Sequence, residues 1–199
     1  MKDYPEIKPN YVKNYTGKED WTPYIRDVET KARYWAVPGV SKYTHRVGGL
    51  EKDYNTGAIS SDGENHQLMV DTRQAKVDNI ADYIPNLEVI GDEDADTLIV
   101  GWGGTFGHLL ETYRGIKEEG HKIAFTQFKF IAPLPRNTAD VLQSYSRIIV
   151  AEQNSGQFAN YLNSRIEGLN IHKYNRTTGQ PFMVSKLVEE FIKILEGEL

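Results

Sequence analysis

The spacing of hydrophobic positions changes near residue 87, so the two parts of the chain predict different structures. From there on, short apolar runs alternate with segments in which apolar residues recur every three or four positions. The runs have the length of buried strands, and the wider spacing is that of amphipathic helices. Such alternation favours a mostly parallel sheet with helices on both faces. Strands are expected in LEVIG, DTLIVGW, KIAFTQFKF, RIIVAE and GLNIHKY, with a helix after each of the last four.

A further helix is expected in residues 61–85. Ser61 or Asp62 can cap its start, and Pro85 ends it. Its apolar positions at helical spacing are Met69, Val70, Val77, Ile80, Ala81 and Ile84.

Residues 1–60 show no sustained period, yet they hold seven of the twelve tyrosines and two of the three tryptophans. Disordered segments are usually poor in aromatic residues. One interpretation is an extended strap that packs on another surface of this chain or of a partner. The other is a poorly ordered terminus taken out of its context. On the first interpretation, Tyr4 to Tyr54 forms little regular structure and is held by aromatic contacts.

Charge and composition narrow the class of partner. A formal net charge of −5 gives no reason to expect nucleic acid or an anionic membrane. No apolar run reaches the roughly 20 residues that cross a bilayer, and the start MKDYPEIKPN lacks a signal-peptide core. The chain has no cysteine, hence no disulfide, thiolate nucleophile or cysteine-held cluster. We therefore expect a cytoplasmic protein.

The stretch LIVGWGGTFG is the first candidate for chemistry. Gly101, Gly103 and Gly107 stand one residue off the dinucleotide-binding spacing. No acidic residue follows at the distance where dinucleotide-binding folds place one to bind the ribose. Lys129 could instead meet the 2′-phosphate of NADP, so that cofactor remains an alternative. We interpret the stretch as a tight strand-to-helix turn, with Gly101 inside the strand.

The remaining candidates form no catalytic set. The five histidines show no metal-binding spacing. Ser155 lacks the first glycine of a nucleophile elbow and is interpreted as a helix N-cap. Glu152 lies at a strand end, where α/β sheets display functional carboxylates, but it has no partner in the sequence. No catalytic residue and no metal ligand is therefore assigned.

Six stretches, taken in order, resemble a known family. They are HRVGGLEKDYNTGAIS, ENHQLMVDTRQAKV, DTLIVGWGGTFG, GHKIAFTQFKFIAPLP, RIIVAEQNSGQFANYL and GQPFMVSKLVEE. Together they resemble the C-terminal part of the alpha subunit of 2-oxoacid:ferredoxin oxidoreductases, in the branch that acts on 2-oxoglutarate. The resemblance covers nearly the whole chain.

The resemblance implies a fold and a domain plan. Residues 86–199 would form a three-layer α/β/α sandwich of the transketolase C-terminal type, with five strands of which the first is antiparallel. Residues 61–85 would be a linking helix, and residues 1–60 an aromatic-rich segment that packs on a partner domain.

The resemblance also implies a reaction. The family decarboxylates a 2-oxoacid on thiamine diphosphate with magnesium, passes electrons through an iron–sulfur cluster to ferredoxin, and transfers the acyl group to coenzyme A. Its substrate-binding motifs Y-P-I-T-P and R-x-G-P-S-T-G-L-P-T are absent from this chain. The chain is therefore expected to hold no cofactor and to be inactive alone. Its partners would be the upstream pyrimidine-binding domain and the beta subunit. The alternative is an independent small α/β module that binds an anion or a partner.

The family's strand order places one more candidate site. The strand at Leu98 would be central, between those at Ile123 and Ile148, with helices leaving to opposite faces. A crevice would then open where two loops begin helices, and their free amides would favour a small anion or a partner's carboxylate. Its lining residues would be Gly103, Gly104 and Thr105 on one side and Asn154, Ser155 and Gly156 on the other.

Overall fold

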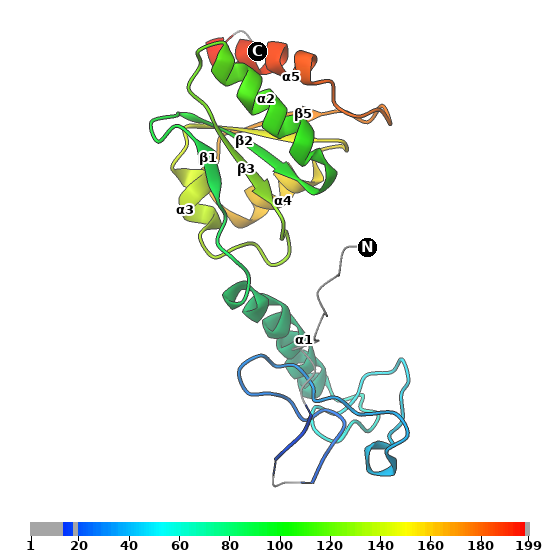
Figure 1. Ribbon diagram of the computed structural model, residues 1–199. Helices are drawn as coiled ribbons and strands as arrows, with labels where there is room; N and C mark the ends of the chain where they lie inside the picture. Colours follow the sequence, from blue (N-terminus) through cyan, green and yellow to red (C-terminus); the bar gives the residue numbers. More distant parts are fainter. Residues whose placement is uncertain (1–13, 18–19, 198–199) are drawn as a thin grey trace, which may run out of the picture. The chain divides into compact units, whose positions relative to one another are not determined.

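The computed structural model describes residues 14–17 and 20–197. The chain divides into two compact units, Met1–Tyr83 and Ile84–Leu199, here called the N-terminal unit and the sheet unit (Figure 1).

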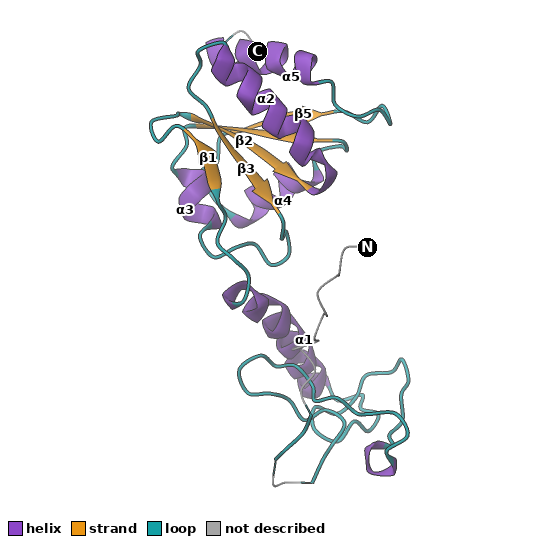
Figure 2. Ribbon diagram, viewed as in Figure 1, coloured by secondary structure: helices purple, strands orange, loops and turns teal. Residues whose placement is uncertain are grey.

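The sheet unit is built on one five-stranded sheet (Figure 2). Its strands are β1 (Val89–Gly91), β2 (Thr97–Trp102), β3 (Ala124–Phe128), β4 (Arg147–Glu152) and β5 (Ile171–Asn175). They lie in the order β1-β3-β2-β4-β5, with β1 antiparallel to β3 and the other neighbours parallel. The predicted sheet, its central strand and its single antiparallel strand are confirmed.

Helices cover both faces of this sheet. They are α2 (Phe106–Glu118), α3 (Thr138–Gln143), α4 (Gln157–Arg165) and α5 (Val184–Glu196). Ile99 of β2 packs in a cluster with residues of α2 and α5, whereas its neighbour Leu98 packs with residues of α3 and α4. Both side chains are fully buried, and each contributes about 1.5–3 kcal/mol of hydrophobic stabilisation. The three-layer α/β/α arrangement follows from this alternation.

The N-terminal unit contains one long helix, α1 (Gly63–Asp78), continued by a 3-10 turn, η2 (Asn79–Asp82). Asp62 caps α1, its carboxylate accepting a hydrogen bond from the Asn65 amide at 2.7 Å. Of the predicted apolar positions, Met69 and Ala81 are buried. Val70, Val77 and Ile80 are instead 40–43% exposed, so part of the predicted apolar face is uncovered within this chain.

Two turns of the same design precede α1. In each, an aspartate side chain accepts hydrogen bonds from the backbone and hydroxyl of the threonine three residues later: Asp27 with Thr30, and Asp53 with Thr56. Each turn closes with one isolated bridge, joining residues 26 and 33 or residues 52 and 59. The two turns are alike because both contain the same sequence pattern, D-x-x-T-x-A.

The rest of the described N-terminal unit is irregular. Its one further helical turn is η1 (Ser41–Tyr43). Trp21 packs against Tyr43 and His45, with ring centroids 4.9 and 5.4 Å away. Tyr4, at the start of the segment expected to be held by aromatic contacts, lies outside the described residues.

Candidate functional site

The glycine-rich stretch forms the end of β2 and a sharp turn into α2. Gly101 lies inside β2, as expected, and Gly103 takes a positive φ of 58° that favours glycine. Residues Gly103–Thr105 form a 3-10 turn, η3. The Thr105 hydroxyl closes it, donating to the carbonyl of Trp102 at 2.8 Å.

On the neighbouring strand, Glu152 ends β4 and is fully buried. Its carboxylate accepts hydrogen bonds from the amides of Phe158 and Ala159, both at 2.9 Å. The indole of Trp102 also donates to it, at 3.3 Å. Glu152 therefore satisfies the first turn of α4 and ties the end of β2 to it, a structural use of the carboxylate that the sequence left as a candidate for chemistry.

The predicted N-cap of α4 is wrong. The Ser155 side chain is exposed and makes no hydrogen bond among the described residues. Asn154 does the capping instead, its side-chain oxygen accepting from the amides of Gly156 and Gln157 at 2.7 and 3.1 Å. Gly156, the residue before α4, has a φ of +89°, a left-handed conformation that favours glycine.

The structure brings together the bases of the two loops predicted to line an anion site. The Trp102–Glu152 hydrogen bond joins the residue before Gly103–Thr105 to the strand that precedes Asn154–Gly156. The first four amides from residue 156 onward already have acceptors in Asn154 and Glu152. An anion at this edge stays a prediction, and its donors would come from the η3 side.

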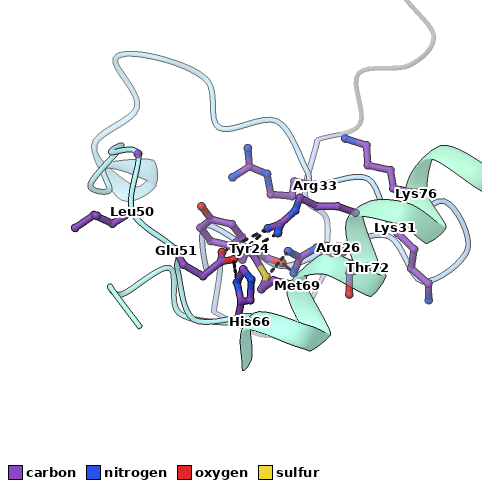
Figure 3. A pocket seen from close by; sticks show the side chains of 12 residues that line it. Tyr24, Arg26, Lys31, Arg33, Leu50, Glu51, His66, Met69, Thr72 and Lys76 are labelled. Carbon is purple, nitrogen blue, oxygen red and sulfur yellow. Dashed lines mark hydrogen bonds and ion pairs between the residues drawn. The ribbon is translucent and has the colours of Figure 1, made fainter. Parts of the chain in front are cut away.

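A second candidate site lies within the N-terminal unit (Figure 3). It is a pocket of about 600 Å³, here called the basic pocket. One face of α1 lines it, together with the first of the two turns and the segment at residues 49–51. Its lining residues are Tyr24, Arg26, Lys31, Arg33, Gly49, Leu50, Glu51, His66, Met69, Thr72, Arg73 and Lys76.

Arg26 is one of the residues that line the basic pocket. Its guanidinium donates to the carbonyls of Tyr24 and Tyr54, both at 2.8 Å, and lies 4.4 Å from the centre of the Tyr54 ring. It also contacts the sulfur of Met69 at 3.3 Å (Figure 3). Burial lowers the pKa of Arg26 from its usual value. Arg26 thus joins the two similar turns to α1.

One carboxylate lines the basic pocket, and it is already engaged. His66 lies 2.8 Å from Glu51, and Arg73 lies 3.4 Å from it. The hydrogen bond with His66 is the largest of the effects that lower the pKa of the Glu51 carboxyl. Arg33 lies 4.8 Å from the centre of the Tyr24 ring, and Lys76 has no hydrogen-bond or ion-pair partner among the described residues.

The described residues offer no metal centre. No three histidine, aspartate or glutamate side chains come together there as ligands. Within the same residues, no helix is both long enough and apolar enough to cross a membrane.

Comparisons with known proteins show similarity to alpha subunits of 2-oxoacid oxidoreductases. Over 196 residues, 98% of this chain, it is 35% identical to the 2-oxoglutarate oxidoreductase subunit KorA of Mycobacterium tuberculosis. Over 168 residues it is 30% identical to the alpha subunit of 2-oxoacid:ferredoxin oxidoreductase 1 of Aeropyrum pernix. The chain is homologous to part of such alpha subunits. It spans 29% and 26% of the two relatives' lengths.

A solved structure supports the same relationship. The 2-oxoglutarate:ferredoxin oxidoreductase of Magnetococcus marinus, solved with 2-oxoglutarate, coenzyme A and succinyl-CoA bound, is similar with a TM-score of 0.81 and 28% identity. The match covers 91% of this chain and 32% of the other. No family model matches the chain. The resemblance to alpha subunits of 2-oxoacid:ferredoxin oxidoreductases, inferred from six short stretches, is confirmed.

The basic pocket could not be predicted from the sequence pattern. Its residues come from segments up to 52 positions apart, Tyr24 to Lys76, and no spacing rule connects them. The repeated D-x-x-T-x-A pattern was the available signal, because each copy predicts a tight turn whose ends lie side by side.

Proposed function

We propose that this chain is part of the alpha subunit of a 2-oxoglutarate:ferredoxin oxidoreductase, where it serves assembly and contacts with other domains rather than catalysis. The observation that carries the proposal is the similarity along 98% of the chain to a relative more than three times as long. The fold likeness to the Magnetococcus marinus enzyme supports it independently.

In that setting, the complete enzyme would oxidatively decarboxylate 2-oxoglutarate, transfer the acyl group to coenzyme A and reduce ferredoxin. Thiamine diphosphate supplies the carbanion chemistry of such reactions. The residues of this chain do not fit an iron–sulfur cluster, because the chain has no cysteine. We assign the cluster, and with it the thiamine diphosphate cofactor and its magnesium, to the other parts of the complex, in the cytoplasm.

The N-terminal unit would provide docking contacts. Its described residues bury few side chains, while Val70 and Val77 lie 40% exposed, seven positions apart on α1. Large apolar side chains left open in this way commonly mark an interaction surface. We propose that residues 1–60 pack on a neighbouring domain or on the beta subunit. Residues 61–85 would form a linking helix, and residues 86–199 would form the transketolase-like domain.

Reconstitution tests this proposal. Co-expression with the beta subunit and the remainder of the alpha subunit should give a complex that turns over 2-oxoglutarate with coenzyme A and a viologen acceptor. The chain alone should give none. In the complex, Val70→Glu with Val77→Glu should lower the yield of assembled enzyme by about tenfold or more, because two charges would replace buried apolar contacts.

Lys186→Glu, a charge change at an exposed position of α5, serves as the control and should leave assembly intact. Turnover by the purified chain alone would overturn the non-catalytic role. If no complex forms with any alpha or beta component, the chain would instead be an independent α/β binding module.

A further inference from the structure

The basic pocket concentrates positive charge in a chain that is acidic as a whole. Five lysine or arginine side chains line it, against the single carboxylate of Glu51. The formal net charge of the chain is −5, so this excess is a local feature. Cations that converge in a concave site repel one another unless an anion binds between them.

Among the described residues, Arg73 is the one cation of the five with an ion-pair partner, whereas Arg26 and Lys31 donate to backbone carbonyls. Lys76 and Arg33 form no salt bridge among the described residues, and Arg33 only lies against the Tyr24 ring. Arg73 shares Glu51 with His66, and its contacts of 3.4–3.5 Å are long for a hydrogen bond. These three side chains are available to a ligand without loss of a strong contact.

The backbone of Lys31 has a left-handed conformation, which residues other than glycine rarely adopt. Its φ is +58°, the only positive φ of a non-glycine residue among those described. The equivalent place in the second turn is held by Gly57, at φ +71°. A left-handed conformation is unfavourable for a residue that carries a Cβ atom. Lysine thus stands on the wall of the basic pocket where the twin turn has glycine. Its ammonium donates a hydrogen bond to the Val28 carbonyl of the same turn at 2.7 Å, and a bound anion would be a second partner for its charge.

We propose that the basic pocket binds a small molecule that carries a diphosphate group. A diphosphate presents several negative charges over a few ångströms, which matches cations supplied by both the first turn and α1. A lone carboxylate would meet one or two of them. The volume of about 600 Å³ lies within the range of small-molecule sites and leaves room for a group attached to the diphosphate.

The inference stands apart from the proposed function, because it rests on this pocket alone. An acidic protein segment is the competing occupant, and it would suit an open face better than a hollow. The test below separates the two.

The experiment titrates the 199-residue chain with pyrophosphate, ADP and adenosine by isothermal calorimetry at low salt. Pyrophosphate and ADP should bind with similar affinity and adenosine should not, because the diphosphate carries recognition. Affinity should fall as salt rises, since the contacts are electrostatic. Two single variants remove a cation from different segments, Lys31→Gly and Lys76→Gln, and Lys186→Gln on α5 is the control.

Each pocket variant should weaken pyrophosphate binding by about fivefold to tenfold, while the control binds as the unaltered chain does. Lys31→Gly is the sharper variant, because it relieves the positive φ and should leave the chain at least as stable by urea denaturation. A loss of binding in that variant therefore cannot come from unfolding. Absence of pyrophosphate binding, or equal loss in Lys186→Gln, would overturn the proposal. Tighter binding of a glutamate-rich peptide than of pyrophosphate would also overturn it, in favour of a protein partner.

Discussion

At the scale of single residues, Glu152 is a strand-end carboxylate whose hydrogen bonds serve the fold rather than a ligand. It is fully buried, and three donors from two different elements converge on it. The location is one where α/β proteins display functional carboxylates. Here the same location supplies acceptors for the first turn of α4, and no face of the carboxylate is left exposed.

Replacement of Glu152 should therefore cost stability. Glu152→Ala leaves the buried amides of Phe158 and Ala159 without acceptors, and we expect a loss of about 3 kcal/mol in the free energy of unfolding. Glu152→Gln keeps one carbonyl acceptor and should cost less. Urea denaturation followed by tryptophan fluorescence measures both. Ser155→Ala should change stability by less than about 0.5 kcal/mol; a cost equal to that of Glu152→Ala would restore Ser155 as the cap.

At the scale of elements, the packing of β2 against α2 depends on Gly101. A Cβ added there would lie 2.5 Å from Leu109 Cδ1 and 2.5 Å from Gln127 Oε1. Gly104, three residues on, has no atom within 4 Å of an added Cβ. The two glycines therefore differ in what surrounds them: Gly101 lies where other atoms approach closely, and Gly104 lies in an open turn.

Alanine substitution should separate these two roles. Gly101→Ala overpacks the β2–α2 contact, and we expect a destabilisation of about 1–3 kcal/mol. Gly104→Ala should be tolerated, with a change in unfolding free energy below about 0.5 kcal/mol. The midpoint of urea unfolding of each variant is the measurement. Equal tolerance at both positions would show that the strand can shift away from the helix.

The elements of the sheet unit could be predicted from the sequence because burial leaves a plain pattern there. A central strand covered on both faces needs an apolar residue at every position, as in Leu98, Ile99 and Val100. The N-terminal unit gives no such pattern. Its turns are closed by side-chain hydrogen bonds, and Arg26 connects them to a carbonyl 28 positions away. Those contacts depend on geometry that periodicity does not encode.

At the scale of the whole molecule, the two units differ in how much they bury. The described residues of the N-terminal unit include four buried side chains, Lys52, Met69, Thr72 and Ala81. The sheet unit has two extensive apolar clusters, one on each face of its sheet. Local stability follows the buried apolar contacts that hold a segment in place, so the units should open independently and at different free energies.

Amide hydrogen exchange should resolve this difference. In the isolated chain, amides of β2 and β4 should exchange at least about a thousandfold more slowly than those of residues 20–62, because only the former require global unfolding. In the complex with the rest of the alpha subunit and the beta subunit, residues 20–62 should become protected, since docking would cover their exposed aromatic and aliphatic side chains. Protection of β2 and β4 should change little and serves as the internal control. Exchange of residues 20–62 that stays fast in an assembled, active complex would show that the N-terminal unit contacts no partner there, and would contradict its proposed role in assembly.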